Sequence, residues 1–439
     1  MATIDFALST NANLEDVMIF EATAALSSIA PNHSCRVDPQ LAGLVLVTVD
    51  HDDAAVRDAL CGMRSVLHIV RLTAILDLPQ GPDALSQLCA QLDGTAASGS
   101  NRLLPDLTRV GQARASFRVC CDRIGTHAFR SVDVERVIGE LIHERQGIPG
   151  RMKDADVIVR VDVLGNKVVI GEQIHHAELA KKRVHPEFIR DASLRPNVAF
   201  AMLHLSGYQP GQFLMDPFVG SGTILLEAAI RFGTRGRFVG MDRSERVVAG
   251  ARANAASLGL ADHVQLVCGN ARALHLAARD AKGQVDAIVC NPPWGIRIGK
   301  QDDVDDLYRG FLNSAAEMLK TGGRAVVLVI RWESFLQHAR CSGRWRVTEA
   351  RPIRTGDMIP VLFVLERVDD TLWTGIKSGI HRLVVLCREG DGVVAPVASA
   401  ESTDDAAVSL TRRADHDHDA HNAPEDPSSQ RSHRRRVSQ

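Results

Sequence analysis

The segment Asn291-Pro292-Pro293-Trp294-Gly295 carries groups that could hold an amine on a planar ring. The side-chain carbonyl of Asn291 can accept one hydrogen of an amine. Two consecutive prolines keep the backbone extended and leave the carbonyl of Pro292 available for a second hydrogen. Trp294 offers a flat face on which a base can stack. The motif alone fits a clamp for an exocyclic NH2 group and fits equally well a Pro-Pro loop with an interface tryptophan.

The clamp directly follows a predicted buried strand. Residues 285–290 are apolar except for Asp286, a pattern that is typical of a strand inside an α/β sheet. Such sheets bind their ligands at the carboxyl ends of their strands. We therefore expect the clamp to lie at the edge of a sheet where ligands bind.

A glycine-rich turn lies upstream, between a predicted strand at 212–215 and a predicted helix at 224–230. The turn reads Asp-Pro-Phe-Val-Gly-Ser-Gly-Thr from Asp216 to Thr223. Its glycines let the backbone approach a ligand closely, and the following helix points its first amides at that ligand. The segment is neither a GxGxxG fingerprint nor a P-loop, because no Gly-Lys-Ser/Thr follows.

Two more predicted strands end in polar residues. Residues 236–241 lead into Asp242, and residues 264–268 lead to Asn270. Asp242 is placed to accept hydrogen bonds from two ribose hydroxyl groups. The alternative for a single acid after a strand is a cap on the next helix.

The glycine turn, the acid and the Asn-Pro-Pro-Trp motif, in this order over roughly residues 190–370, resemble S-adenosylmethionine-dependent amino-methyltransferases of nucleic acids. The resemblance implies that the glycines flank the methionine part of the cofactor and that Asp216 lies near its amino group. Asp242 would hold the ribose, and Asn270 would meet the adenine at a position where many relatives carry Asp. The predicted catalytic residues are Asn291, Pro292 and Trp294, and the predicted cofactor-binding residues are Asp216, Phe218, Gly220, Gly222, Thr223, Asp242, Asn270 and Asn291.

The first 80 residues alternate strand and helix patterns. Strands are predicted at 4–8 and 41–49, and helices at 14–26, with Asn13 as the cap, and at 54–60. This region is similar to the ferredoxin-like start of THUMP-containing RNA methyltransferases.

The next region contains a strand at 115–123, a helix at 132–144 capped by Ser131, and a hairpin of strands 156–164 and 168–171. It resembles a THUMP domain, an RNA-binding module. Six arginines and two aspartates lie between 102 and 130, which favours a phosphate-binding surface over an ordinary solvated basic face. His127 and the Cys120-Cys121 pair lack metal-ligand spacing and are expected to pack. The predicted RNA-binding residues are Arg118, Arg123, Arg130, Lys181 and Lys182.

Composition sets further bounds. The 439 residues suffice for two or three domains, and the net charge of −2 means that RNA contacts must come from local patches. The nine cysteines contain no CxxC pair, so we predict a reduced, intracellular protein without a metal site. No apolar run approaches the ~18 residues of a membrane span, and the N-terminus lacks a basic start followed by an apolar stretch, which predicts a cytoplasmic protein that does not enter membranes.

The predicted fold class is α/β, with a ferredoxin-like region and THUMP module followed by a Rossmann-like, seven-stranded methyltransferase sheet. A helix at 305–320, a turn at 321–323, a strand at 324–330 and an antiparallel pair at 347–353 and 361–366 would complete that sheet. The predicted domains are a ferredoxin-like region at 1–80, a THUMP domain at 81–175, a basic linker at 176–195, a methyltransferase domain at 196–388 and a disordered tail at 389–439.

The resemblance implies methyl transfer from S-adenosylmethionine to the 2-amino group of a guanosine in tRNA, in or near the acceptor stem. The main alternative is an amino-methyltransferase that acts on guanosine or adenosine of ribosomal or other RNA. A DNA adenine or protein glutamine methylase, or an RNA-binding protein with an inactive cofactor fold, would also share parts of the pattern. The expected partner is tRNA, and in a eukaryotic relative a small zinc-binding activator subunit would be added.

Overall fold

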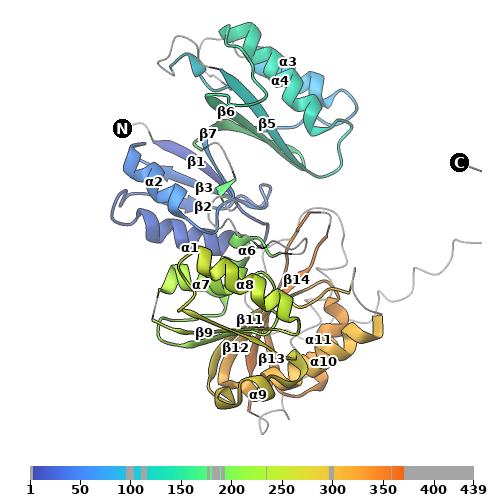
Figure 1. Ribbon diagram of the computed structural model, residues 1–439. Helices are drawn as coiled ribbons and strands as arrows, with labels where there is room; N and C mark the ends of the chain where they lie inside the picture. The colour runs from blue at the N-terminus through green and yellow to red at the C-terminus, as the bar shows by residue number, and fades with distance from the viewer. Residues whose placement is uncertain are drawn as a thin grey trace, which may run out of the picture. The chain divides into compact units, whose positions relative to one another are not determined.

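The computed structural model describes residues 3–94, 103–109, 116–175, 178, 179, 188, 193–233, 235–295, 301–356 and 358–369. These residues form two seven-stranded sheets (Figure 1). The predicted linker residues Lys181 and Lys182 and the predicted tail at 389–439 lie outside the described residues. No helix within the described ranges is both long enough and apolar enough to cross a lipid bilayer.

The first sheet begins with a βαββαβ unit. Its strands follow the order β2-β3-β1-β4, and every neighbouring pair is antiparallel. This is the ferredoxin-like arrangement, which confirms the prediction for this region. The elements are β1 (Ile4–Ser9), α1 (Glu15–Leu26), β2 (Ser34–Arg36), β3 (Leu44–Val49), α2 (Ala54–Gly62) and β4 (His68–Asp77).

Strand β4 is shared with the THUMP region. Residues 68–71 of β4 pair with β1 on one side, and residues 70–77 pair with β7 on the other, so the sheet continues as β4-β7-β6-β5 across the boundary predicted at residue 80. The remaining elements are α3 (Ala84–Gly94), a short 3-10 helix (Leu107–Arg109), β5 (Phe117–Ile124), α4 (Ser131–Gln146), β6 (Val157–Leu164) and β7 (Lys167–Gln173).

The second sheet has the order β10-β9-β8-β11-β12-β14-β13. The strands β10, β9, β8, β11 and β12 run parallel to one another. Strand β14 lies between β12 and β13 and runs antiparallel to both. The strand order reverses between β8 and β11, and open α/β sheets bind ligands at such a point. The elements are α6 (Pro196–Leu205), β8 (Phe213–Asp216), α7 (Thr223–Phe232), β9 (Arg237–Asp242), α8 (Glu245–Ser257), β10 (Val264–Cys268), short helices (Ala271–Ala273, Leu274–Ala277 and Arg279–Ala281), β11 (Val285–Cys290), α10 (Gln301–Met318), β12 (Leu319–Val329), α11 (Trp332–Cys341), β13 (Trp345–Pro352) and β14 (Val361–Arg367).

Alternating side chains of the central strands supply two apolar layers. On β11, Ile288 belongs to the layer that packs on α10 and α11, and Val289 belongs to the layer that packs on α6, α7 and α8. Because both faces are covered, these strands read as continuous apolar runs. The prediction of a Rossmann-like, seven-stranded sheet is confirmed.

Several predicted boundaries are wrong. Helix α10 ends at Met318, and Leu319 already pairs with Val285 in the sheet. Residues 320–323 were predicted as the end of a helix and a turn. They are instead extra residues within β12, because Leu319 pairs with Val285 and Arg324 pairs with Ala287. The predicted strand at 41–49 begins only at Leu44.

Two predicted helix caps are also wrong. Asn13 lies in the left-handed region with a φ of 71°, and its side-chain amide donates to the carbonyl oxygen of Pro352 over 2.7 Å, while Leu14 occupies the cap position. Ser131 is the first residue of α4 rather than its cap. The side chain of Asp133 accepts the N–H of Arg130 at that helix start over 2.8 Å.

Candidate active site

The parallel register brings the predicted polar residues to one edge of the second sheet. Asp216 pairs with Gly240 of β9, and Asp242 pairs with Cys268 of β10. Asn270 follows the end of β10, and Asn291 follows the end of β11, which pairs with β8. All four residues therefore lie at or just beyond the carboxyl ends of neighbouring strands.

Asp216 is a buried acid at the end of β8, with 1% of its surface exposed. Its Oδ1 accepts the N–H of Phe218 over 3.0 Å. Burial raises the pKa of the Asp216 carboxyl to about 8, while that N–H opposes the rise and the charge of Asp242 adds to it. A cation beside this carboxyl would stabilise its ionised form, as an ammonium group does.

The turn after Asp216 depends on two glycines with positive φ. Gly220 has a φ of 54° and Gly222 has a φ of 91°. Residues that carry a Cβ atom rarely adopt these positive φ angles. Gly222 caps α7, and the hydroxyl of Thr223 at the helix start lies 3.2 Å from that of Ser221. The first amides of α7 therefore point toward the same sheet edge as the acid.

Phe218, which was predicted to bind the cofactor, lies inside the same turn. Its ring is partly buried and meets Phe311 of α10 edge to face, with ring centroids 5.2 Å apart. The ring is thus held on the apolar layer beneath the turn.

Asn254 is a structural residue of this site that the sequence reasoning missed. It is fully buried on α8, and its side-chain NH2 donates to the carbonyl oxygens of Ser221 and Phe188, over 2.9 and 2.8 Å. Its Oδ1 accepts the N–H of Phe188 over 2.8 Å. The available signal was an asparagine on the apolar stripe of α8, where Ala251 and Ala255 are also buried.

Asp242 and Asn270 each use one oxygen to cap the backbone that follows. Oδ1 of half-buried Asp242 accepts the N–H of Ser244 over 3.0 Å, and Oδ1 of exposed Asn270 accepts the N–H of Arg272 over 3.0 Å. Asn270 thereby caps the short helix Ala271–Ala273, whereas Asp242 is not a helix cap, because Ser244 is the N-cap residue of α8. Because a carboxylate has about four acceptor sites, Asp242 retains acceptors for a ribose.

The Asn-Pro-Pro-Trp turn is fixed from two sides. The indole N–H of Trp294 donates to Oδ1 of Asn291 over 3.0 Å and to the carbonyl oxygen of Leu328 over 3.3 Å. The hydroxyl of buried Tyr308, from α10, donates to the carbonyl oxygen of Pro293 over 3.1 Å. Pro292 is buried at the centre of the turn.

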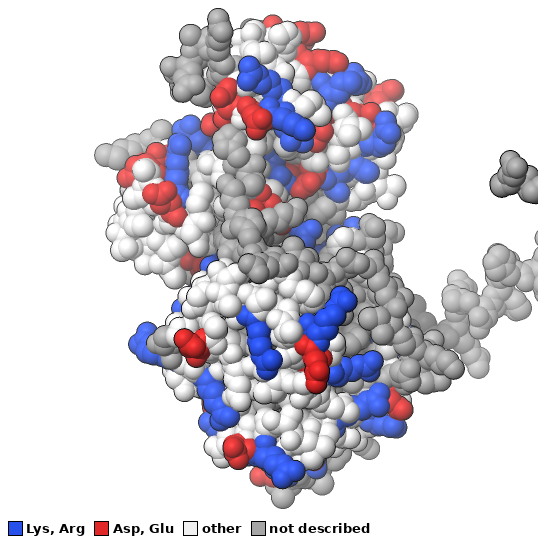
Figure 2. Space-filling model, viewed as in Figure 1, with Lys and Arg blue, Asp and Glu red and all other residues white. Residues whose placement is uncertain are grey.

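The arginines predicted to bind RNA differ in their surroundings. Arg118 is exposed on β5. The Arg130 side chain is 78% exposed and lies 3.4 Å from Asp133. On the face that Figure 2 shows, basic and acidic side chains are interspersed rather than gathered into one patch.

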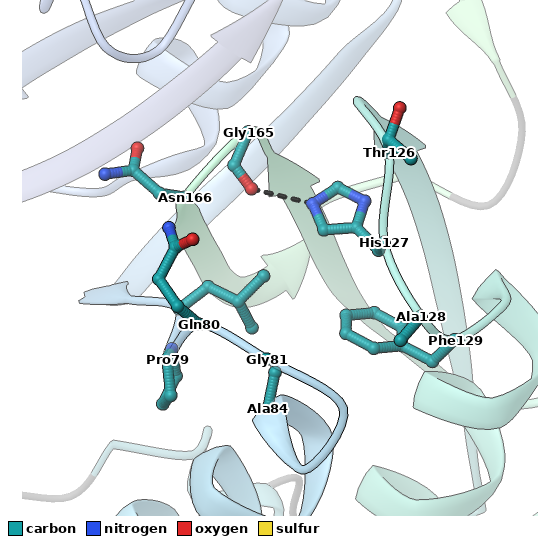
Figure 3. A pocket seen from close by; sticks show the side chains of 11 residues that line it. Pro79, Gln80, Gly81, Ala84, Thr126, His127, Ala128, Phe129, Gly165 and Asn166 are labelled. Atoms are coloured by element: carbon teal, nitrogen blue, oxygen red, sulfur yellow. Dashed lines mark hydrogen bonds between the residues drawn. The ribbon is translucent and has the colours of Figure 1, made fainter.

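Arg123 has internal partners, one of which, His127, lines a pocket of about 300 Å³ (Figure 3). One guanidinium nitrogen of Arg123 lies 3.1 Å from the carbonyl oxygen of Gly125 and 3.0 Å from Nδ1 of His127. Because a guanidinium only donates, Nδ1 accepts, and Nε2–H donates to the carbonyl oxygen of Gly165 over 2.7 Å. A neutral His127 thus joins the loop after β5 to the β6–β7 hairpin, as expected for a packed side chain. Within the described ranges, no group of three His, Cys, Asp or Glu side chains could hold a metal ion.

Comparison with known proteins identifies the family. A family model described as "THUMP domain" matches residues 105–171, and one described as "RMKL-like, methyltransferase domain" matches residues 183–359. The tRNA (guanine(6)-N2)-methyltransferase of Thermus thermophilus is 33% identical over 362 residues, which are 82% of this chain and 98% of that protein. The chain belongs to the THUMP domain-containing tRNA (guanine-N2)-methyltransferase family.

Solved structures agree with this membership. The structure of TrmN from Thermus thermophilus matches this THUMP-containing methyltransferase with a TM-score of 0.64 and 30% identity, over 83% of this chain and all of the TrmN chain. SMU.472, a putative methyltransferase complexed with SAH, matches with a TM-score of 0.59 over 86% of this chain and 100% of its own. At 17% identity, SMU.472 supports the fold alone.

Proposed function

We propose that this enzyme transfers a methyl group from S-adenosylmethionine to the exocyclic 2-amino group of a guanosine in tRNA, in or near the acceptor stem. The observation that carries the proposal is the convergence of the acid, the glycine turn and the Asn-Pro-Pro-Trp turn at one edge of the parallel sheet. The name of the Thermus thermophilus relative supports the choice of the guanosine 2-amino group in tRNA.

The proposed cofactor, S-adenosylmethionine, fits the polar groups that lie at this edge of the sheet. The buried carboxyl of Asp216 suits an ammonium group, and the amides at the start of α7 suit a carboxylate. Asp242 would accept hydrogen bonds from the ribose hydroxyls, and Asn270 would contact the adenine. Bound S-adenosylmethionine would supply an electrophilic methyl group.

The proposed role of the Asn-Pro-Pro-Trp turn is to hold the acceptor amine. Oδ1 of Asn291 and the carbonyl oxygen of Pro292 would accept its two hydrogens, so that the nitrogen lone pair points at the methyl group. Positioning of this kind supplies a large part of the rate enhancement of an enzyme. A guanosine in a stem would have to leave the helix to reach the turn.

The proposed role of the first sheet is to bind tRNA. The resemblance to THUMP domains implies that this module holds the 3′ end of tRNA, which would fix the distance from that end to the base that enters the active site. Arg118, Arg123 and Arg130 are the described residues proposed to contact phosphates, and a base in or near the acceptor stem fits this geometry.

Nucleoside mass spectrometry tests the proposal. Unmodified tRNA transcripts are incubated with the enzyme and S-adenosylmethionine and then digested. We expect N2-methylguanosine at a single acceptor-stem position, and none with Asn291→Ala. Methylated adenosine, or methylation of ribosomal RNA but not tRNA, would contradict the proposal and favour the alternative amino-methyltransferase.

A further inference from the structure

The side chain of Asn291 can serve the proposed clamp in only one of its two orientations. Its carbonyl oxygen can accept a hydrogen from an amine, whereas its own NH2 group can only donate. An asparagine at the end of a strand can present either group by a rotation of its terminal torsion angle, which is broad and roughly two-fold. The clamp therefore needs a second contact that selects the orientation.

Trp294 supplies that contact. Its indole N–H is a donor only, so the atom of Asn291 that lies 3.0 Å away must be the carbonyl oxygen. The same N–H also approaches the carbonyl oxygen of Leu328 in β12 over 3.3 Å, which fixes the indole relative to the sheet. Because an amide oxygen has two lone pairs, Oδ1 can accept a further hydrogen from a substrate.

The indole is itself held by packing. The Trp294 ring is partly buried and packs on the apolar layer that also contains residues of α6, α7 and the central strands. Tyr308 fixes the neighbouring carbonyl of Pro293 from the opposite layer, through its hydroxyl. The turn is thus anchored from both layers of the sheet, and only Trp294 reaches the Asn291 side chain among the contacts described.

We propose that Trp294 is a positioning residue, whose indole N–H orients the Asn291 amide so that Oδ1 faces the acceptor amine. This inference rests on the proposed function. It differs from the stacking role predicted for Trp294, because it assigns the essential property to the N–H rather than to the flat ring. Phenylalanine would keep a ring but could not perform the proposed role.

The cleanest test removes the N–H and nothing else. Trp294 is replaced with 3-benzothienylalanine, an isostere in which sulfur takes the place of the indole nitrogen, and with Phe. If the N–H orients Asn291, kcat should fall about tenfold or more in both variants, since small losses of alignment are costly in catalysis. The Kd values for S-adenosylmethionine and tRNA should stay within about twofold of wild type in the isostere, because the N–H donates to Asn291 and Leu328 of the protein and not to either ligand.

Trp345 offers a matched control. Its indole N–H donates to the carbonyl oxygen of Leu312 over 3.3 Å, and its side chain is buried far along the chain from the turn. Trp345→Phe and the same isostere at Trp345 lose a similar bond and should leave kcat unchanged. Wild-type kcat in the Trp294 isostere would overturn the inference, and so would a fall in kcat matched by an equal loss of cofactor or tRNA binding.

A second readout uses the protein without cofactor or RNA. In Asn291→Asp, the acceptor becomes a carboxylate and the hydrogen bond becomes charge-assisted. The indole proton of Trp294 should then move downfield in the NMR spectrum, while that of Trp345 stays in place. An unmoved Trp294 resonance would overturn the inference. The proposed function fails separately, if wild-type enzyme forms no N2-methylguanosine.

Discussion

The two seven-stranded sheets place their functional residues in different ways. In the second sheet, parallel strands bring residues as distant in sequence as Asp216 and Asn291 to one edge. In the first sheet, neighbouring strands are antiparallel except for β5 and β6, and its predicted RNA-binding arginines lie on one strand and in the loop after it. The second sheet thus gathers side chains from several parallel strands at one edge, whereas the predicted RNA-binding arginines of the first sheet come from the single edge strand β5 and the loop after it.

The difference extends to how charge is used. In the second sheet, the buried acid Asp216 has a raised pKa and lies where a cation is expected. In the first sheet, the buried cation Arg160 is paired internally, with its Nε 2.9 Å from Asp162 and a further bond to Asp122. The buried acid of the second sheet is therefore placed for the proposed cationic ligand, whereas the buried cation of the first sheet stabilises a local structure.

The largest expected effect is at the clamp. Asn291→Ala removes the side chain that is proposed to hold the acceptor amine, and we expect kcat to fall about 100-fold or more, as for other groups that act at the reacting centre. Calorimetry should show nearly unchanged cofactor binding. The control is Asn32→Ala, at an exposed residue of the first sheet whose amide lies 3.5 Å from Asp50. Normal turnover in Asn291→Ala would remove the clamp from the account.

The next effect is on cofactor affinity. Asp242→Ala deletes the charged group that is proposed to accept hydrogen bonds from the ribose hydroxyls, at about 1.5–3 kcal/mol for each charge-assisted bond. Isothermal calorimetry should show S-adenosylmethionine binding weakened accordingly. Exposed Asp262 lies in the loop before β10 and provides the control variant Asp262→Ala. Wild-type affinity in a folded Asp242→Ala protein would exclude the ribose assignment.

The raised pKa of Asp216 predicts a pH dependence of stability. The pKa of Asp216 is raised to about 8 in the folded protein, whereas an unfolded Asp has a pKa of about 3.9. The contribution of the protonated Asp216 to stability is fully present below the unfolded pKa and is lost as the pH rises from there to the folded pKa of about 8. Between these two pKa values the unfolding free energy should fall by up to about 1.4 kcal/mol per pH unit. Denaturant titrations of wild type and Asp216→Asn should show this slope in the wild type alone. Parallel profiles would mean that Asp216 is ionised in the free fold.

The smallest effect is expected in the first sheet, where the charges are distributed. Arg118→Glu should weaken tRNA binding several-fold. It should also make the plot of log binding constant against log salt concentration less steep by about 0.7–0.9, the slope of one phosphate contact. Filter binding across a salt series measures both quantities. Arg136→Glu is the matched reversal on α4, where Arg136 lies 3.3 Å from Glu140. Equal behaviour of the two variants would mean that β5 does not contact RNA.

The contrast between the sheets also explains what could be predicted from the sequence. Asp216, Asp242 and Asn291 were predictable because each follows a local strand pattern, and parallel topology alone brings them together. The hydrogen bonds from the Asn254 side chain to the carbonyl oxygens of Ser221 and Phe188 were not predictable, because they join segments that are far apart in the chain. The same applies to the bond between Trp294 and Leu328 of the neighbouring strand.

Boundaries failed where tertiary pairing overrode local signals. Residues 320–323 include two glycines, which indicated a turn, yet β11 extends the pairing back to Leu319 and absorbs them within a strand. The sharing of β4 between two modules was missed for a similar reason. Residues 68–71 of this ten-residue strand pair with β1 and residues 70–77 pair with β7, and the local pattern of β4 does not indicate which strands lie beside it.

The most direct test of the account asks whether both sheets act on one substrate. Initial methylation rates are measured for an intact tRNA and for the same tRNA without its unpaired 3′ end, at equal concentrations of enzyme and S-adenosylmethionine. If the first sheet holds the 3′ end while the second sheet methylates the guanosine, the initial rate for the trimmed tRNA should be lower by a factor of about ten or more. Equal rates for the two tRNAs would contradict the account.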